Sequence, residues 1–216
     1  MADRTTHAIR PRRLLLIGMM GSGKSTLGRA LEQRLGWPYL DNDRILEAAT
    51  GSSARELLVA GGTDALRAGE AAALRYACAT RPPAIAGIAA GTILDADLRA
   101  EIDAAGDVVW LRGRPETLVR RVLAKDQDEE GDHRPWHGGS RETAAAWFRE
   151  EHARRSALYA SIADLVVDIE APAGADRTVE ELADQVLVWL ARPGVERRAL
   201  GDGRLPAPDV PPSADR

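Results

Sequence analysis

Residues 14–26 read LLLIGMMGSGKST, and this stretch decides the fold of the chain. Four apolar residues, typical of a buried strand, precede the spacing G-x-x-x-x-G-K-[ST] of a phosphate-binding loop. Its glycines let the backbone turn tightly and point successive N–H groups into one concavity. Residues 27–31 continue as a helix, whose N-terminal dipole attracts anions. This strand and helix are the context that the motif requires, which argues against a chance match in a glycine-rich turn.

The polar residues of this loop suit the binding of a nucleoside triphosphate. Lys24 can reach the β- and γ-phosphates, and the hydroxyl of Ser25 can bind Mg²⁺. We therefore predict ATP as co-substrate and Mg²⁺ as cofactor. The loop residues predicted to bind ATP are Gly18, Gly21, Ser22, Gly23, Lys24, Ser25 and Thr26.

Composition narrows the class of protein and its partners. The 216 residues are enough for one domain, and 44% hydrophobic with 29% charged residues is a globular balance. A net charge of −4 makes nucleic acid a poor partner, and no stretch approaches a membrane span. Cys78 is the only cysteine, so we expect a small buried apolar residue and no internal disulfide. The polar, basic residues 1–13 do not resemble a secretory signal, so we expect a cytoplasmic protein. We also expect a monomer.

Strand and helix patterns alternate along the chain. The apolar runs that predict strands are 14–17, 37–40, 83–87, 108–111 and 165–168. The segments that predict helices are 24–35, 44–49, 54–60, 63–79, 95–104, 115–124, 141–162 and 179–190. Strands that alternate with helices form a parallel sheet covered on both faces. We predict an α/β fold, a three-layer sandwich around a central five-stranded parallel sheet.

The chain divides into one domain and two flanking segments. We expect a flexible N-terminus over residues 1–12 and a domain over 13–192. Residues 125–140 are polar and too long for a simple connection, which predicts a lid. Residues 193–216 are rich in Pro, Gly, Asp and Arg, and we expect a disordered tail there.

Two carboxylates follow the second predicted strand, in the sequence Asp41-Asn42-Asp43. Ligands gather at the carboxyl ends of the strands of an open parallel sheet. An acidic pair beside a phosphate-binding loop can hold Mg²⁺ and can deprotonate an attacking hydroxyl. The alternative interpretation is a turn and helix cap, where Asp and Asn are favoured. Two carboxylates at alternate positions beside the loop favour the functional interpretation.

With these motifs the chain resembles the shikimate kinase family, part of the nucleoside-monophosphate-kinase-like P-loop group, over residues 14 to 190. The loop, with Gly28 in the following helix, and the D-x-D of Asp41 and Asp43 carry the resemblance. Four further segments match family motifs. Leu66-Arg67 with Glu70 matches F-R-x-x-E, and Arg134-Pro135 matches the R-P of the lid. Residues 155–159 match R-x-P-L-Y, and Arg121 matches an arginine at the base of the lid. The resemblance implies a P-loop kinase fold with a lid segment.

The resemblance also implies the roles of the site residues. Asp41 would lie near the Mg²⁺ with Ser25, and Asp43 would be the base on a substrate hydroxyl. The implied catalytic residues are Lys24, Asp43 and Arg134. Arg121 and Arg134 would join the loop in binding ATP, and the implied substrate-binding residues are Asp43, Arg67, Ala90, Gly91 and Arg155. A guanidinium grips a carboxylate bidentately, so two arginines would orient a small acid firmly.

The sequence departs from the family pattern at the third strand and in the lid. Three consecutive glycines are replaced by Ala89, Ala90 and Gly91, and two methyl groups would crowd the substrate if these positions need positive φ. Residues 125–133 are longer and more acidic than the family lid, and Trp136 replaces an aliphatic residue. These departures concern the substrate more than the reaction.

Three functions follow, in order of preference. The first is ATP-dependent phosphorylation of a hydroxyl on a small hydroxy acid, with shikimate as the leading acceptor, in aromatic amino acid biosynthesis. The second is a kinase for another polyol or hydroxy acid, such as gluconate. The third is a non-catalytic nucleotide-binding regulator, which the loss of glycine at Ala89 and Ala90 favours. The retention of the loop, the acidic pair and Arg134 argues against the third.

Overall fold

The computed structural model describes residues 9–126 and 141–192. Three expectations therefore lie wholly or largely outside the described residues. They are the flexible N-terminus over 1–8, the lid from residue 127 onward with Arg134, and the tail over 193–216.

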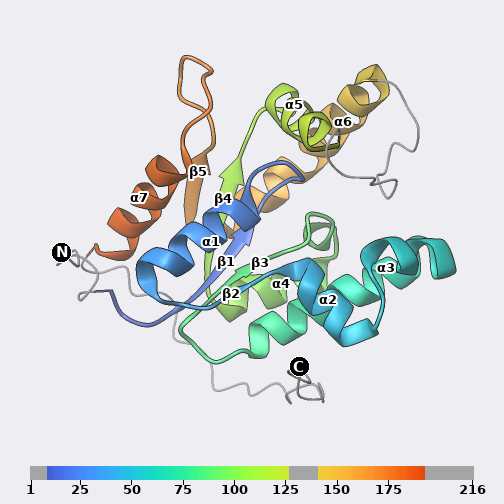
Figure 1. Ribbon diagram of the computed structural model, residues 1–216, viewed down its shortest axis with the longest axis horizontal. Coiled ribbons are helices and arrows are strands. Elements are labelled where there is room, and N and C mark those ends of the chain that lie inside the picture. The colour runs from blue at the N-terminus through green and yellow to red at the C-terminus, as the bar shows by residue number, and fades with distance from the viewer. Residues whose placement is uncertain (1–8, 127–140, 193–216) are drawn as a thin grey trace.

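A five-stranded parallel sheet forms the centre of the domain (Figure 1). β1 (Arg13–Ile17) pairs with β3 (Ala84–Gly87) on one side and with β4 (Asp107–Arg112) on the other. β2 (Tyr39–Leu40) and β5 (Leu165–Asp168) complete the order β2-β3-β1-β4-β5. The order brings the carboxyl ends of β1, β2 and β3, with the loops that follow them, to one end of the sheet. The predicted sheet is confirmed.

Helices cover both faces of this sheet, as predicted (Figure 1). Their bounds are α1 (Lys24–Leu35), α2 (Asn42–Thr50), α3 (Ala54–Ala79), α4 (Ala96–Ala105), α5 (Pro115–Asp126), α6 (Arg141–Ile162) and α7 (Val179–Leu190), with a short 3₁₀ turn, η2 (Thr92–Leu94). α1 and α7 pack together on one face, and α4 and α6 pack on the other, with α3 against α4. The result is the expected three-layer sandwich.

α3 differs from the two helices predicted over 54–60 and 63–79. It begins at a capping box, in which Ser53 and Glu56 satisfy each other's backbone N–H groups, and runs to Ala79. The two predicted segments join across Gly62, whose φ of 68° and ψ of −161° kink the helix. Thr63, where the second helix was predicted to begin, therefore lies inside the element. Gly62 has no Cβ, so it adopts this positive φ without strain and the helix continues beyond the kink.

The core lies on both faces of β1. Residues 14–16 are fully buried and Ile17 is 2% exposed, so this strand is apolar in a continuous run, as a central parallel strand requires. Leu27 and Leu31 of α1 pack into the same core. Within the described ranges, no helix has the length and apolarity needed to cross a membrane.

Cys78 is buried in α3, as expected, and burial raises the pKa of its thiol to about 11. The thiolate is the reactive form, so the folded protein should react with iodoacetamide about 100-fold more slowly at mildly alkaline pH than the urea-unfolded chain. Intact-mass spectrometry over time measures both rates. Equal rates in the two states would contradict the buried position of Cys78.

Candidate active site

The phosphate-binding loop connects β1 to α1 and has the geometry that its glycines predict. Gly21 and Gly23 adopt positive φ, 79° and 92°. A Cβ on Gly21 would lie 2.8 Å from Cγ2 of Val122 and 2.9 Å from the carbonyl oxygen of Leu118, so only glycine fits there. Gly23 is the N-cap of α1 and makes no side-chain capping bond. The N-terminus of α1 therefore has no side-chain acceptor at its cap and suits an anion.

Lys24 folds its side chain over this loop. Its amine donates to the carbonyl oxygens of Gly18 at 2.9 Å and Met19 at 3.2 Å. Burial lowers the pKa of Lys24 to about 8, Asp43 opposes this shift, and Arg155 adds to it. The lysine therefore lies within electrostatic reach of both an acid and an arginine of the predicted site.

The two carboxylates after β2 have different surroundings. Asp41 is the N-cap of α2, because its Oδ1 accepts from the backbone N–H of Asp43 at 3.2 Å, and its Oδ2 lies 3.6 Å from Nη2 of Arg29. The capping alternative therefore holds for Asp41. Asp43 is exposed in the first turn of α2, where Oδ1 accepts from Asn42 Nδ2 at 3.2 Å. Its carboxylate faces solvent and is available to a substrate hydroxyl.

The oxygens beside the loop suit Mg²⁺. Ser25 is exposed beside the phenol of Tyr39, and the carboxylate of Asp41 lies within electrostatic reach of the same phenol. In residues 9–126 and 141–192 there is no cluster of three or more His, Cys, Asp or Glu that could hold a metal. Mg²⁺ is usually held by one or two protein oxygens together with substrate phosphates and waters, so Ser25 and Asp41 fit such an ion.

Tyr39 is a site residue that sequence reasoning missed. Its ring lies against Gly28 of α1, where a Cβ would overlap it, and its hydroxyl would lie 2.5 Å from a Cβ on Gly87. Burial is the main cause that raises the pKa of this phenol to about 12. The sequence signal for this contact was Gly28, a glycine inside a helix with no turn to require it, which indicates that a bulky group packs against it.

Arg67 reaches from α3 to the end of β3. Its guanidinium lies so close to Gly91 that a Cβ there would overlap it. Gly91 has a φ of −82°, so it is the arginine's approach, and not the backbone conformation, that favours glycine here. Nη1 of Arg67 forms an ion pair with Glu70. Burial raises the pKa of Glu70, and Arg67 opposes that shift.

The expected crowding at Ala89 and Ala90 depended on positive φ, and that condition is not met. Among the described residues, none other than glycine has positive φ. Ala90 instead contributes its carbonyl oxygen, which accepts from Arg155 Nη1 at 3.2 Å and from the Tyr159 hydroxyl at 2.9 Å. A backbone carbonyl accepts these two hydrogen bonds whether the residue is glycine or alanine, so Ala90 can take the place of the family glycine.

Arg155 enters the interior from α6, whereas Arg154 is exposed. Besides its bond to Ala90, Arg155 forms an ion pair with Glu151, one turn earlier on the same helix. Its guanidinium carbon lies 5.6 Å from the ring centroid of Trp147. Of the two neighbouring arginines, Arg155 is therefore the one that points toward the loop after β3, and it is the arginine that the R-x-P-L-Y resemblance names.

Arg121 lies beside the loop on α5. Its Nη1 is 3.9 Å from the position of a Cβ on Gly23, and its Nε is 3.3 Å from Oδ2 of Asp176. Arg134, the other arginine predicted to bind ATP, lies outside the described residues. The structure thus brings Arg121 to the nucleotide loop.

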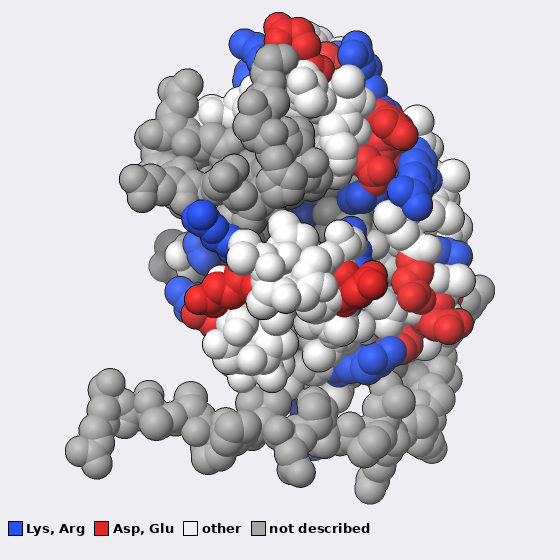
Figure 2. Space-filling model, turned by 90° about the vertical axis from the view of Figure 1, so that its right-hand side faces the viewer, with Lys and Arg blue, Asp and Glu red and all other residues white. Residues whose placement is uncertain are grey.

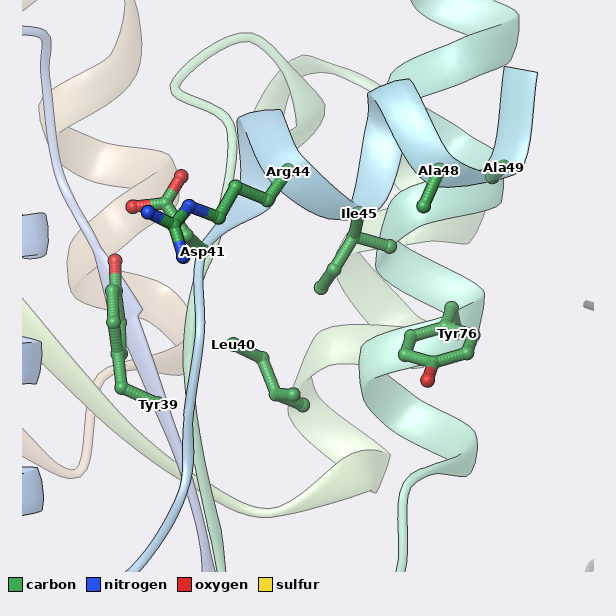
Figure 3. Close-up of a pocket in the computed structure, with 8 residues that line it drawn as sticks. All are labelled: Tyr39, Leu40, Asp41, Arg44, Ile45, Ala48, Ala49 and Tyr76. Atoms are coloured by element: carbon green, nitrogen blue, oxygen red, sulfur yellow. The ribbon is translucent and has the colours of Figure 1, made fainter. Parts of the chain in front are cut away.

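A pocket of about 200 Å³ lies beside the edge strand β2 (Figure 3). Its side chains come from β2, α2 and α3, and they are Tyr39, Leu40, Asp41, Arg44, Ile45, Ala48, Ala49 and Tyr76. Asp41 is the only residue of the predicted site among them. Tyr39, which lies against Gly28 of α1, also lines this pocket, so the pocket borders the predicted site.

Solved structures share this fold. Shikimate kinase from Acinetobacter baumannii, in complex with shikimate, superposes with a TM-score of 0.73 at 24% identity over 86% of this chain and 96% of that one. A gluconokinase from Sinorhizobium meliloti gives 0.54 at 20% identity over 84% and 92%. At such identities the likeness establishes the fold.

Sequence comparison identifies the family. Shikimate kinase from Oleidesulfovibrio alaskensis is 34% identical over 183 residues, 84% of this chain and 99% of the relative. Shikimate kinase from Paramagnetospirillum magneticum is 37% identical over 124 residues, 57% of this chain and 60% of the relative, so that match spans about three fifths of the relative's length. The family model "Shikimate kinase" matches residues 20–191. The chain belongs to the shikimate kinase family, a family of ATP-dependent kinases.

Proposed function

We propose that this protein transfers the γ-phosphoryl group of ATP to a hydroxyl of shikimate. The observation that carries the proposal is the convergence of four side chains where β1, β2 and β3 end. Lys24 lies within electrostatic reach of Asp43 and Arg155, and Glu70, which pairs with Arg67, is within reach of the same two residues. A phosphate-binding cation, a base and two carboxylate-binding arginines are the groups that this reaction needs.

The reaction assigns a step to each group. The loop N–H groups and Lys24 hold the phosphates of ATP, with Arg121 beside them and Arg134 proposed to reach the transferring group. Bound Mg²⁺, held through Ser25 and Asp41, would neutralise phosphate charge. The acceptor hydroxyl oxygen bonds to the γ-phosphorus, the bond to the β,γ-bridging oxygen breaks, and ADP leaves. Asp43 accepts the hydroxyl proton.

The acceptor is proposed to be an acid because two guanidinium groups border the same backbone. Arg67 lies against Gly91, and Arg155 binds the carbonyl of Ala90. A carboxylate between them would receive charge-assisted hydrogen bonds. The fold shared with the shikimate-bound enzyme from A. baumannii supports shikimate as that acid. We also propose that the protein acts as a cytoplasmic monomer in aromatic amino acid biosynthesis, a role that family membership supports.

Gluconate is the second candidate acceptor, because the fold is also shared with a gluconokinase. A coupled assay of ADP release over a panel of cyclic and open-chain hydroxy acids separates the two. We expect the highest kcat/KM with shikimate. A higher value with gluconate would overturn the acceptor, and ADP release that no acid stimulates would favour the non-catalytic regulator.

Replacing Arg67 by alanine is expected to raise the KM for shikimate about 10- to 100-fold, the loss of a charge-assisted hydrogen bond of roughly 1.5–3 kcal/mol. The KM for ATP should change little, since ATP uses other cations. Arg75→Ala, an exposed arginine on the same helix paired with Glu101, is the matched control. Equal KM values for shikimate in the Arg67 variant and its control would contradict the clamp.

A further inference from the structure

Glu151 is a buried carboxylate that the proposed reaction does not use. It is 9% exposed, and Arg155, its partner, is 5% exposed. Oε2 of Glu151 pairs with Nη2 of Arg155, and Oε1 lies 3.4 Å from Nη1 of Arg154. Burying a carboxylate is costly unless a cation compensates it, so the charge of Arg155 is what keeps Glu151 stable there.

Part of the guanidinium of Arg155 already binds groups of its own chain. Nη1 donates to the carbonyl of Ala90, and Nη2 faces Glu151. Nε is buried and has no hydrogen-bond partner among the residues that the structure describes. A guanidinium has five N–H donors but one positive charge, so an incoming carboxylate would use the remaining donors and share that charge with Glu151.

The site as a whole is balanced in charge. Arg67 pairs with Glu70, Arg155 pairs with Glu151, and Asp43 lies within reach of Lys24. Figure 2 shows Lys and Arg side chains next to Asp and Glu side chains on one face of the molecule. An acid entering such a site meets arginines whose charge is already matched, and it also meets repulsion from Glu151.

We propose that Glu151 determines acceptor specificity by acting as an internal carboxylate on Arg155 and weakening the preference of the site for acids over neutral analogues. The inference rests on the proposed function, because it concerns the acceptor of that same reaction. Glu151 does not touch the reacting atoms in this scheme, so it is a positioning residue. Replacing Glu151 should therefore change the affinity for the acceptor and leave the affinity for ATP unchanged.

The substitution Glu151→Gln keeps the size of the side chain and removes its charge. We expect the KM and the calorimetric Kd for shikimate to fall about tenfold, with the KM for ATP unchanged. Without shikimate the variant should melt at a lower temperature, because Arg155 loses its buried partner, and added shikimate should raise its Tm more than it raises that of the parent. Glu150→Gln, an exposed neighbour on α6, is the control. An unchanged or higher Kd for shikimate would overturn the inference.

A second measurement needs no variant. Calorimetry on the parent protein compares shikimate with its primary amide, which has the same ring and hydroxyls but no carboxylate. We expect the amide to bind less than about 100-fold more weakly than the acid, because Glu151 already matches the charge of Arg155 and Arg67 alone discriminates. A preference for the acid of about 100-fold or more would overturn the inference and leave the proposed function intact. Failure of the parent to bind shikimate at all would overturn both.

Discussion

Replacing Lys24 by alanine is expected to abolish phosphoryl transfer while the protein stays folded. The amine is the cation of the phosphate-binding loop, and loss of such a charge removes several kcal/mol of transition-state stabilisation. Its hydrogen bonds in the structure are to two loop carbonyls, of Gly18 and Met19, and the residue lies at the start of α1, outside the apolar core. Its removal therefore takes no side chain from the apolar cluster between the sheet and its helices.

ADP release and circular dichroism together measure this result. Arg34→Ala is the control, because it removes a cation from the far end of the same helix, where Arg34 pairs with Asp184. The control should keep full activity. Full turnover by the Lys24 variant would mean that the loop is not a catalytic phosphate site.

Replacing Asp43 by asparagine is expected to lower kcat by about 100- to 10,000-fold, the usual contribution of a general base. The amide keeps the size of the side chain and one acceptor oxygen, but it cannot take the hydroxyl proton. The affinity for ATP should change far less, since Asp43 is proposed to contact the acceptor. The exposed carboxylate in the first turn of α2 is free of the capping role, which belongs to Asp41.

The control for Asp43 is Glu47→Gln, an exposed acid one turn further along α2. Single-turnover kinetics with saturating ATP separate the chemical step from binding. A variant that loses ATP affinity but turns over bound shikimate normally would show that Asp43 is a structural or metal-binding residue.

The sheet and most helices could be predicted because their signals are local. The apolar run at 14–17 and the loop that follows it fix β1 and α1, and the shorter runs predict the other four strands to within two residues at each end. α3 was predicted as two helices, over 54–60 and 63–79, with Gly61 and Gly62 between them. The capping box at Ser53 and the alanine-rich sequence after the kink let one helix continue.

The site was less predictable, since its contacts join residues far apart in sequence. Nothing local distinguishes buried Glu151 from exposed Glu150, and only the packing of α6 separates them. From the sequence, Gly91 suggests a backbone conformation that only glycine adopts, whereas in the structure it leaves space for the guanidinium of Arg67. The motifs identified which residues matter, but which carboxylate accompanies each arginine depends on the tertiary structure.

The most direct test of the central claim is ³¹P nuclear magnetic resonance of the reaction itself. Purified protein, ATP, Mg²⁺ and shikimate are incubated together, and the phosphorus signals are followed with time. We expect a phosphomonoester signal to grow in equal amounts with ADP, and to be absent when shikimate is omitted. ADP that forms with inorganic phosphate alone, or no ADP at all, would contradict the assignment of this protein as a shikimate-phosphorylating enzyme.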